Sequence, residues 1–191
     1  MEKFSLAIRP NDDIVFKVKQ AKHLLRSESG KSFRSQNSEA HISLFEYETE
    51  RKDNKLLLLD DLSKIVSSLK PFEITYNGFN HFSNPNDSHT FFIGLKGETA
   101  VTIREYARSI QEKSQFNLID KCRIPHMSIG RGLSRKQLEK AYSLFKAFDE
   151  KEFCLSFVLR RFNPWRKQYD IIAKLPLLGV NNLYGQMSLF G

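Results

Sequence analysis

The chain carries one four-residue pattern twice, as His41-Ile42-Ser43-Leu44 and as His126-Met127-Ser128-Ile129. Each copy sets a histidine two residues before a serine within an apolar run. Residues i and i+2 of a β-strand project from the same face, so each copy directs an imidazole and a hydroxyl to one side of a sheet. The apolar residues would anchor the strand in a core on the other side. Two such strands side by side would surround one small anion with two histidines and two hydroxyls, which predicts a phosphate-sized site with its own acid and base.

The composition is that of a globular protein with an anionic partner. A chain of 191 residues with 40% hydrophobic content, including 16 Phe, can bury the core of one domain or of two merged lobes. Lys and Arg number 30 against 22 Asp and Glu, and the net charge of +8 favours nucleic acid, a nucleotide or a membrane surface as partner.

The sequence shows no sign of export or of a disulfide framework. Lys3 and Arg9 interrupt the apolar N-terminal stretch, and no run reaches the roughly 20 apolar residues of a membrane helix. We therefore expect a soluble, cytoplasmic protein without a signal peptide. Cys122 and Cys154 are too few for a disulfide framework or a thiolate zinc site, so we expect buried free thiols.

The pattern of apolar residues and turn signals predicts an α+β fold. Besides the two histidine strands, we expect strands at residues 4–8, 72–79, 90–95, 153–162 and 168–175, and helices at residues 14–26, 54–69, 99–113 and 134–148. The polar stretch 27–37 is expected to form a flexible loop that can close over a ligand.

The order of these elements repeats. Both halves run strand, helix, histidine strand, helix, strand, and the two histidines are separated by close to half of the 191 residues. We therefore expect a bilobal, pseudo-two-fold duplication with two antiparallel-rich sheets, flanking helices and a central cleft. The lobes would follow chain order at about residues 1–80 and 89–179, and residues 180–191 would form a C-terminal tail.

The second copy has a wider context that identifies a family. Pro125-His126-Met127-Ser128-Ile129-Gly130-Arg131 resembles the Pro-His-x-Thr-Leu-x-Arg motif of the two-histidine (2H) phosphoesterase superfamily, in its branch of 2′-5′ RNA ligases and RNA 2′,3′-cyclic phosphodiesterases. Both hydroxyl positions are Ser where the family typically has Thr. Glu46 also stands where an aromatic residue often follows the first motif, which leaves the choice of substrate open.

Opening a cyclic phosphodiester explains these residue types. One imidazole can deprotonate water on one side of phosphorus while the other protonates the leaving oxygen, and with an unperturbed pKa of about 6.5 one can be neutral while the other is charged. Ser43 and Ser128 can donate to the non-bridging oxygens, and Arg131 can add a charged donor. This chemistry requires no metal or other cofactor. The resemblance implies that His41 is the acid and His126 the base, with roles that could exchange in the ligation direction.

Other uses of the histidines and serines are less well supported. His23, His81 and His89 form no helical i, i+4 pair with the motif histidines and no Cys/His cluster with metal-ligand spacing. His81 and His89 flank a turn rich in Ser, Asn, Pro and Asp, so we expect them to be exposed loop residues. The sequence contains neither a phosphate-binding P-loop nor the Gly-x-Ser-x-Gly elbow of serine hydrolases.

Two further segments suggest partners. A run of cations and aromatics predicts RNA contacts at a hairpin tip between the last two strands, by phosphate binding and base stacking. Its members are Arg160, Arg161, Phe162, Trp165, Arg166 and Lys167. The alternative is a solvated basic turn with Phe162 and Trp165 packed inward.

The second segment is Gln186-Met187-Ser188-Leu189-Phe190, which resembles the peptide by which bacterial proteins bind the replication sliding clamp. Gln186, Leu189 and Phe190 would be its contact residues. The alternative is that Leu189 and Phe190 fold back onto the domain.

These observations predict a monomeric, metal-independent cyclic phosphodiesterase acting on RNA ends or nucleotides with a 2′,3′-cyclic phosphate, with 2′-5′ RNA ligation as a possible reverse activity. One alternative is a phosphoesterase for another cyclic nucleotide or an ADP-ribose derivative. Another is a noncatalytic module that binds RNA or the sliding clamp.

Overall fold

The computed structural model describes residues 1–51 and 54–180. Within them the elements follow the predicted order, except that the strand expected at 153–162 is divided into two and that a short strand at 119–120 was not predicted. The strands are β1 (Glu2–Ile8), β2 (Ile42–Thr49), β3 (Phe72–Ser83), β4 (His89–Leu95), β5 (Ile119–Asp120), β6 (Met127–Leu133), β7 (Lys151–Cys154), β8 (Ser156–Asn163) and β9 (Gln168–Pro176). The helices are α1 (Asp12–Ser29), α2 (Asn54–Ser67), α3 (Gly97–Lys113) and α4 (Arg135–Leu144).

The strands form a continuous path in the order β7-β3-β4-β6-β2-β1-β8-β9, with β5 added beside β2. All neighbouring strands are antiparallel. The middle of the path is the contact of β2 with β6, where Ile42 lies opposite Met127. The predicted α+β class is confirmed, and the two expected sheets meet edge to edge at the two histidine strands.

The duplication in element order is accompanied by an exchange of strands. One half runs β1-α1-β2-α2-β3 and the other runs β4-α3-β6-α4-β8, with β5, β7 and β9 as additions. The last strand of each half pairs with the first strand of the other, because β3 lies beside β4 and β8 lies beside β1. The two sides of the sheet therefore do not follow chain order. This corrects the predicted lobes of residues 1–80 and 89–179, because local patterns predict strands but not their partners.

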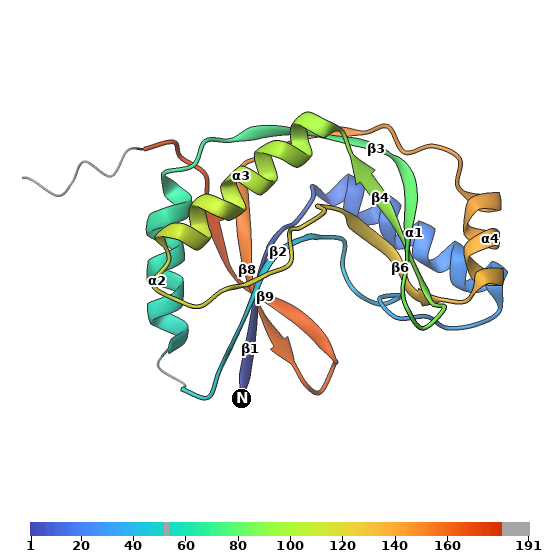
Figure 1. Cartoon of the computed structure of the whole chain (residues 1–191), viewed down its shortest axis with the longest axis horizontal. Helices are drawn as coiled ribbons and strands as arrows, with labels where there is room; N and C mark the ends of the chain where they lie inside the picture. Colours follow the sequence, from blue (N-terminus) through green and yellow to red (C-terminus); the bar gives the residue numbers. More distant parts are fainter. Residues whose placement is uncertain (52–53, 181–191) are drawn as a thin grey trace, which may run out of the picture.

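The helices are exchanged in the same way (Figure 1). Helix α1 packs against α4 and β6 on one side of the molecule, whereas α2 packs against α3 and β9 on the other. Asn11 begins α1, since its side-chain oxygen accepts a hydrogen bond of 2.9 Å from the Ile14 amide. Gly30 ends the helix in the left-handed conformation, with φ of 63°.

The apolar residues of the two histidine strands are core residues, as expected. Ile42, Leu44, Met127 and Ile129 are completely buried. The predicted buried thiols are also confirmed, since Cys122 and Cys154 are buried and unpaired. Burial raises the pKa of each of these two thiols to about 12. None of the helices in the described residues is long and apolar enough to cross a membrane.

The predicted flexible loop 27–37 is partly helix and otherwise well anchored. Ser27 to Ser29 belong to α1. Arg34 and Arg131 exchange two backbone hydrogen bonds, of 2.9 and 3.0 Å, which fasten the loop to β6. The ammonium of Lys22, a buried residue of α1, donates to the carbonyls of Ser35 and Ser38 at 3.1 and 2.7 Å. The loop is therefore held in place on the side of β6.

Candidate active site

The contact of β2 with β6 brings the two histidine motifs together. Both histidines stand directly before their strands, and the antiparallel register that sets Ile42 opposite Met127 sets His41 beside Ser128 and Ser43 beside His126. All four side chains line one cavity of about 440 Å³. We call this the central cavity. Its lining also includes Arg131 and, from elements far apart in the chain, Ser5, Glu39, Glu46, Phe82, Thr90, Lys121, Arg160, Phe162, Lys167 and Tyr169.

The two histidines have the same hydrogen-bond geometry. Nδ1 of His41 donates to the Glu39 carbonyl at 2.7 Å, and Nδ1 of His126 donates to the Ile124 carbonyl at 2.8 Å. A carbonyl can only accept, so each Nδ1 carries a proton and each Nε2 is left to exchange one. His126 is further fixed by Phe82 and Phe92, whose ring centroids lie 5.1 and 4.9 Å from its own.

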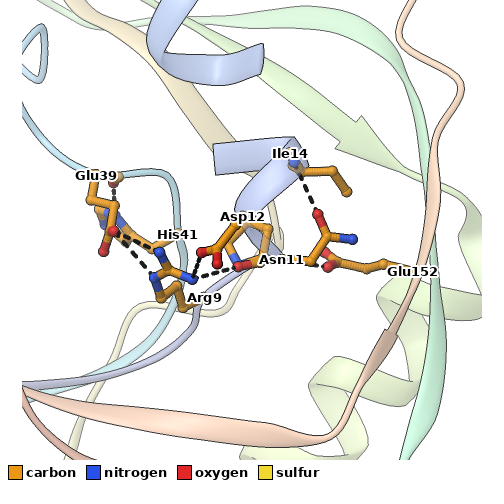
Figure 2. A network of polar contacts seen from close by, with 8 residues as sticks. Arg9, Asn11, Asp12, Ile14, Glu39, His41 and Glu152 are labelled. Atoms are coloured by element: carbon orange, nitrogen blue, oxygen red, sulfur yellow. Dashed lines mark hydrogen bonds and ion pairs between the residues drawn. The ribbon is translucent and has the colours of Figure 1, made fainter. Parts of the chain in front are cut away.

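A second layer of contacts supports His41 (Figure 2). The guanidinium of Arg9 binds the carboxylate of Glu39 through Nε at 3.1 Å and Nη2 at 3.0 Å. Its Nη1 lies 2.8 Å from the Asp12 carboxylate at the start of α1. Figure 2 shows that this network leads from α1 through Arg9 to the residue whose carbonyl holds the His41 ring. His41 is thus oriented by β1 and α1 as well as by its own strand.

The surroundings of both imidazoles favour the neutral form. Burial lowers the pKa of His41 well below its ordinary value of 6.5, and the positive charges of Arg160, Lys22 and Arg131 lower it further. Burial also lowers the pKa of His126, with a smaller contribution from Arg131. A bound anion would offset these positive charges and raise both pKa values again.

The central cavity holds more positive groups than the sequence indicated. Lys121, next to the short strand β5, lines it and forms an ion pair of 2.9 Å with Glu46. Glu46 is the acidic residue that departs from the family pattern, and this ion pair balances its charge. Neither β5 nor the position of Lys121 was predicted, because a two-residue strand leaves no pattern in the sequence.

The structure separates the residues predicted to bind RNA. Arg160 lies within β8 and is only 6% exposed, so it is not at the hairpin tip, and it lines the central cavity together with Phe162 and Lys167. Arg161, the next residue of β8, is exposed and pairs with Glu2 at 3.5 Å. Successive side chains of a strand point to opposite faces of the sheet, which explains why these two neighbouring arginines have different surroundings.

The turn between β8 and β9 carries the remaining predicted contacts. Trp165 is 93% exposed there, so the alternative in which it packs inward is wrong. Arg166 forms an ion pair with Asp170. The predicted clamp-binding residues Gln186, Leu189 and Phe190 lie outside the described residues, and their role stays a prediction.

The expectation that His81 and His89 are exposed loop residues is wrong. The strands β3 and β4 extend further than predicted and include both histidines. His81 Nδ1 lies 2.9 Å from the Tyr142 hydroxyl, and His89 is 9% exposed with Nδ1 3.2 Å from the Ser83 hydroxyl. Neither residue lines the central cavity. Across residues 1–51 and 54–180, no group of three or more His, Cys, Asp or Glu side chains is arranged to hold a metal ion.

Solved structures with a similar fold cover almost the whole chain. TT0787 of Thermus thermophilus has a TM-score of 0.68 and 17% identity, over 95% of this chain and 100% of that chain. E. coli LigT complexed with 3′-AMP has a TM-score of 0.58 and 12% identity, over 92% and 98% of the two chains. Kluyveromyces marxianus Usb1 with uridine monophosphate has a TM-score of 0.57 and 12% identity, again over 92% and 98%.

A comparison with curated protein sequences gives no match. The model of one sequence family, however, matches residues 10–169, which include both histidine motifs and the strands β2 to β8. The match agrees with the resemblance seen in the second motif. The chain therefore belongs to the 2′-5′ RNA ligase superfamily, whose members are phosphoesterases and ligases.

Proposed function

We propose that this protein opens 2′,3′-cyclic phosphates at RNA ends or on nucleotides by metal-independent general acid and base catalysis. The observation that carries the proposal is the pairing of the two motifs, which places His41, Ser43, His126 and Ser128 on one cavity. In each imidazole Nδ1 is bound to a backbone carbonyl, which leaves Nε2 for proton transfer. Two imidazoles supply both proton transfers that the reaction needs.

The proposed reaction balances its protons within the site. His126 takes a proton from water, the water oxygen bonds to phosphorus, and the bond from phosphorus to one ribose oxygen breaks. His41 donates a proton to that leaving oxygen. The product is a phosphate monoester with a free neighbouring hydroxyl. One further proton exchange with solvent returns the histidines to their starting states.

The remaining groups stabilise the charge on phosphorus. The hydroxyls of Ser43 and Ser128 donate to the non-bridging oxygens, where negative charge accumulates in the transition state. Arg131 adds a positive charge from β6. Its backbone is fixed by the two hydrogen bonds with Arg34, so the loop at residues 30–40 helps to position this side chain.

The same arrangement supports ligation. If the 5′-hydroxyl of a second RNA replaces water, the same two proton transfers join the strands, and the reverse reaction exchanges the roles of His41 and His126. The family whose model matches this chain is named after 2′-5′ RNA ligation. The nucleotides named for the similarly folded LigT and Usb1 structures, 3′-AMP and uridine monophosphate, agree with a nucleotide-sized substrate.

The test is turnover of adenosine 2′,3′-cyclic phosphate and of RNA ending in a cyclic phosphate, with and without EDTA. We expect EDTA-resistant turnover that falls by about 10²- to 10⁴-fold in both His41→Ala and His126→Ala. The control is His23→Ala, which removes an exposed histidine of α1 outside the central cavity. Binding without turnover would instead favour a noncatalytic module. Turnover of other cyclic nucleotides or ADP-ribose derivatives alone would identify another phosphoesterase.

A further inference from the structure

Arg160 is a buried cation at the central cavity that forms no close ion pair within the described residues, and the carboxylates of Glu39 and Glu46 act on its charge only from a longer distance. Its side chain is 6% exposed, and Nη2 donates to the Ser5 hydroxyl at 2.8 Å. Its Nε is buried and has no hydrogen-bond partner. No carboxylate in residues 1–51 or 54–180 lies within ion-pair distance of Arg160.

The two carboxylates of the central cavity are occupied by other cations. Glu39 binds Arg9 and Glu46 binds Lys121. The ring of Tyr169 lies beneath the guanidinium, with 5.4 Å from Cζ to the ring centroid, and contributes an aromatic face but no charge. A buried charge without a partner is costly. A bound anion would supply the close partner that this charge lacks.

Arg160 is displaced from the two histidine motifs across the sheet. Ser5 of β1 pairs with Glu46 of β2 on one side and with Arg160 of β8 on the other. Neighbouring strands are about 4.8 Å apart, so the backbone of β8 lies roughly 10 Å from that of β2. The side chain of Arg160 extends from β8 into the cavity, and its charge acts on His41. The guanidinium therefore lies close enough to the histidines to serve the same ligand, while its strand lies two strands away from β2, which suits a second phosphate of that ligand.

The size and chemistry of the cavity agree with such a ligand. Its volume of about 440 Å³ lies within the range of roughly 300 to 1,000 Å³ for small-molecule sites. The planar guanidinium fork fits a phosphate through two parallel hydrogen bonds. Lys167 lines the cavity beside Arg160 and Tyr169 and adds a second positive charge. In a nucleotide with a 2′,3′-cyclic phosphate, the other phosphate is attached to the 5′-oxygen, at the opposite end of the ribose.

We propose that Arg160 binds the 5′-phosphate of the nucleotide that carries the cyclic phosphate. This inference rests on the proposed function and narrows its substrate class. RNA ends and 5′-phosphorylated nucleotides are preferred, whereas nucleoside 2′,3′-cyclic monophosphates lack the group that Arg160 recognises. The phosphate can be a terminal monoester or the diester that links the last two nucleotides of an RNA, and separate substrates distinguish these sources.

The test compares three substrates: adenosine 2′,3′-cyclic phosphate, its 5′-phosphorylated form, and the dinucleotide ApA with a 2′,3′-cyclic phosphate. We expect kcat/KM to be about 10- to 100-fold higher for the second and third than for the first, the range for hydrogen bonds to charged groups. In Arg160→Met the three values should converge. The matched control is Arg161→Met, which removes the exposed neighbour on the same strand and should keep the preference.

Two further measurements separate recognition from folding. In ligand-free Arg160→Met the unfolding temperature should be equal to or above that of the wild type, because a buried charge without a partner is removed; a marked fall would indicate a structural role and overturn the proposal. Arg160→Lys keeps the charge without the fork and should show an intermediate preference.

A binding measurement tests this inference independently of the proposed function. Adenosine 3′,5′-bisphosphate should bind the wild type at least tenfold more tightly than 3′-AMP, and this difference should vanish in Arg160→Met, whether or not any substrate is turned over. Turnover of all three substrates with equal kcat/KM in the wild type would reject the role of Arg160 but would leave the proposed function intact. A gain for the 5′-phosphorylated nucleotide but none for the dinucleotide would reject recognition of RNA ends.

Discussion

Arg9 and Glu39 are joined by two contacts to one carboxylate oxygen, at 3.1 Å from Nε and 3.0 Å from Nη2. The pair fixes the segment before β2, and the backbone carbonyl of Glu39 accepts the Nδ1 proton of His41. A change at Arg9 therefore reaches the proposed acid through the backbone, without contact between Arg9 and the substrate.

We expect Arg9→Met to lower kcat by roughly ten- to 100-fold with little change in KM, because a small misplacement of a catalytic ring is costly whereas the phosphate-binding groups remain. The nitrogen resonances of the His41 ring should change in the same variant. Lys17→Met is the control, because it removes an ion pair of 2.5 Å with Glu150, and neither of these two residues lines the central cavity. Full kcat in Arg9→Met would mean that the strand alone orients His41.

The serine hydroxyls provide a second prediction. Ser43→Ala and Ser128→Ala should each lower kcat on the order of 10²-fold, because each removes a donor to the developing charge on phosphorus. Ser43→Thr and Ser128→Thr keep the hydroxyl and a residue type suited to strands, so they should retain most of the activity. Steady-state kinetics on RNA with a cyclic phosphate would measure both pairs. Equal losses in the Ala and Thr variants would show that packing rather than hydrogen bonding is responsible.

The lowered pKa values of the histidines predict a pH dependence. In the free protein both pKa values lie below 6.5, so the form with one charged and one neutral imidazole is most populated below pH 6.5. We therefore expect kcat/KM to peak in that range and to fall as pH rises and the pair of imidazoles loses its remaining proton. Bound phosphate offsets the positive charges of Arg160, Lys22 and Arg131 around His41, so the peak of kcat should lie at higher pH. Coincident profiles would contradict this coupling.

Arg160→Met checks the cause of that dependence. Removing one positive charge beside His41 should raise the pKa of its imidazole, which is the lower of the two, so the rising limb of kcat/KM should move to higher pH than in the wild type. In Arg161→Met the limb should stay in place. An unmoved limb in both variants would show that Arg160 does not contribute to the low pKa of His41.

The hydrogen bonds of Lys22 predict that this residue stabilises the loop beside the cavity. Its amine is buried, which lowers its pKa to about 8, and it donates to the carbonyls of Ser35 and Ser38. In Lys22→Met these carbonyls lose their donor, at a cost of about 1–3 kcal/mol. Hydrogen exchange at the Arg34 and Ser38 amides should then be about tenfold faster or more, whereas exchange of the buried Ile42 amide should not change.

Lys19→Met is the matched control for that measurement, because Lys19 is an exposed residue of the same helix. Unaltered exchange at the Arg34 and Ser38 amides of Lys22→Met would mean that the two backbone hydrogen bonds between Arg34 and Arg131 are sufficient to hold the loop.

The sequence predicted the site where local spacing determines it. The alternation of buried and exposed residues around His41 and His126 is a property of each strand by itself. The capping of α1 by Asn11 is likewise a local property of the sequence. The burial of Lys22 also left a signal. Ile14, Val18 and Leu25 form the buried stripe of α1, and Lys22 occupies the position in that stripe where another apolar residue is expected.

The rest of the site depends on strand pairing, which local patterns do not specify. Arg160 is next to Arg161 in the sequence, but it is buried because its side chain contacts Ser5 on the neighbouring strand β1, which lies 155 residues away in the sequence. His81 and His89 were misassigned for a related reason. The turn residues between them indicated a loop, but β3 and β4 pair up to the residues that immediately flank the turn.

The exchange of β3 and β8 has a consequence for how such a molecule could be assembled. A protein made of residues from one half alone would leave its first strand without the neighbour that it has here. Two identical half-length copies trading their final strands would restore every one of these neighbours and place one motif from each copy at the shared axis. Gene fusion of a symmetric homodimer would therefore have preserved a complete catalytic centre instead of creating one, and features present on only one side, such as Arg160 on β8 and Lys121 next to β5, would then have diverged after the fusion.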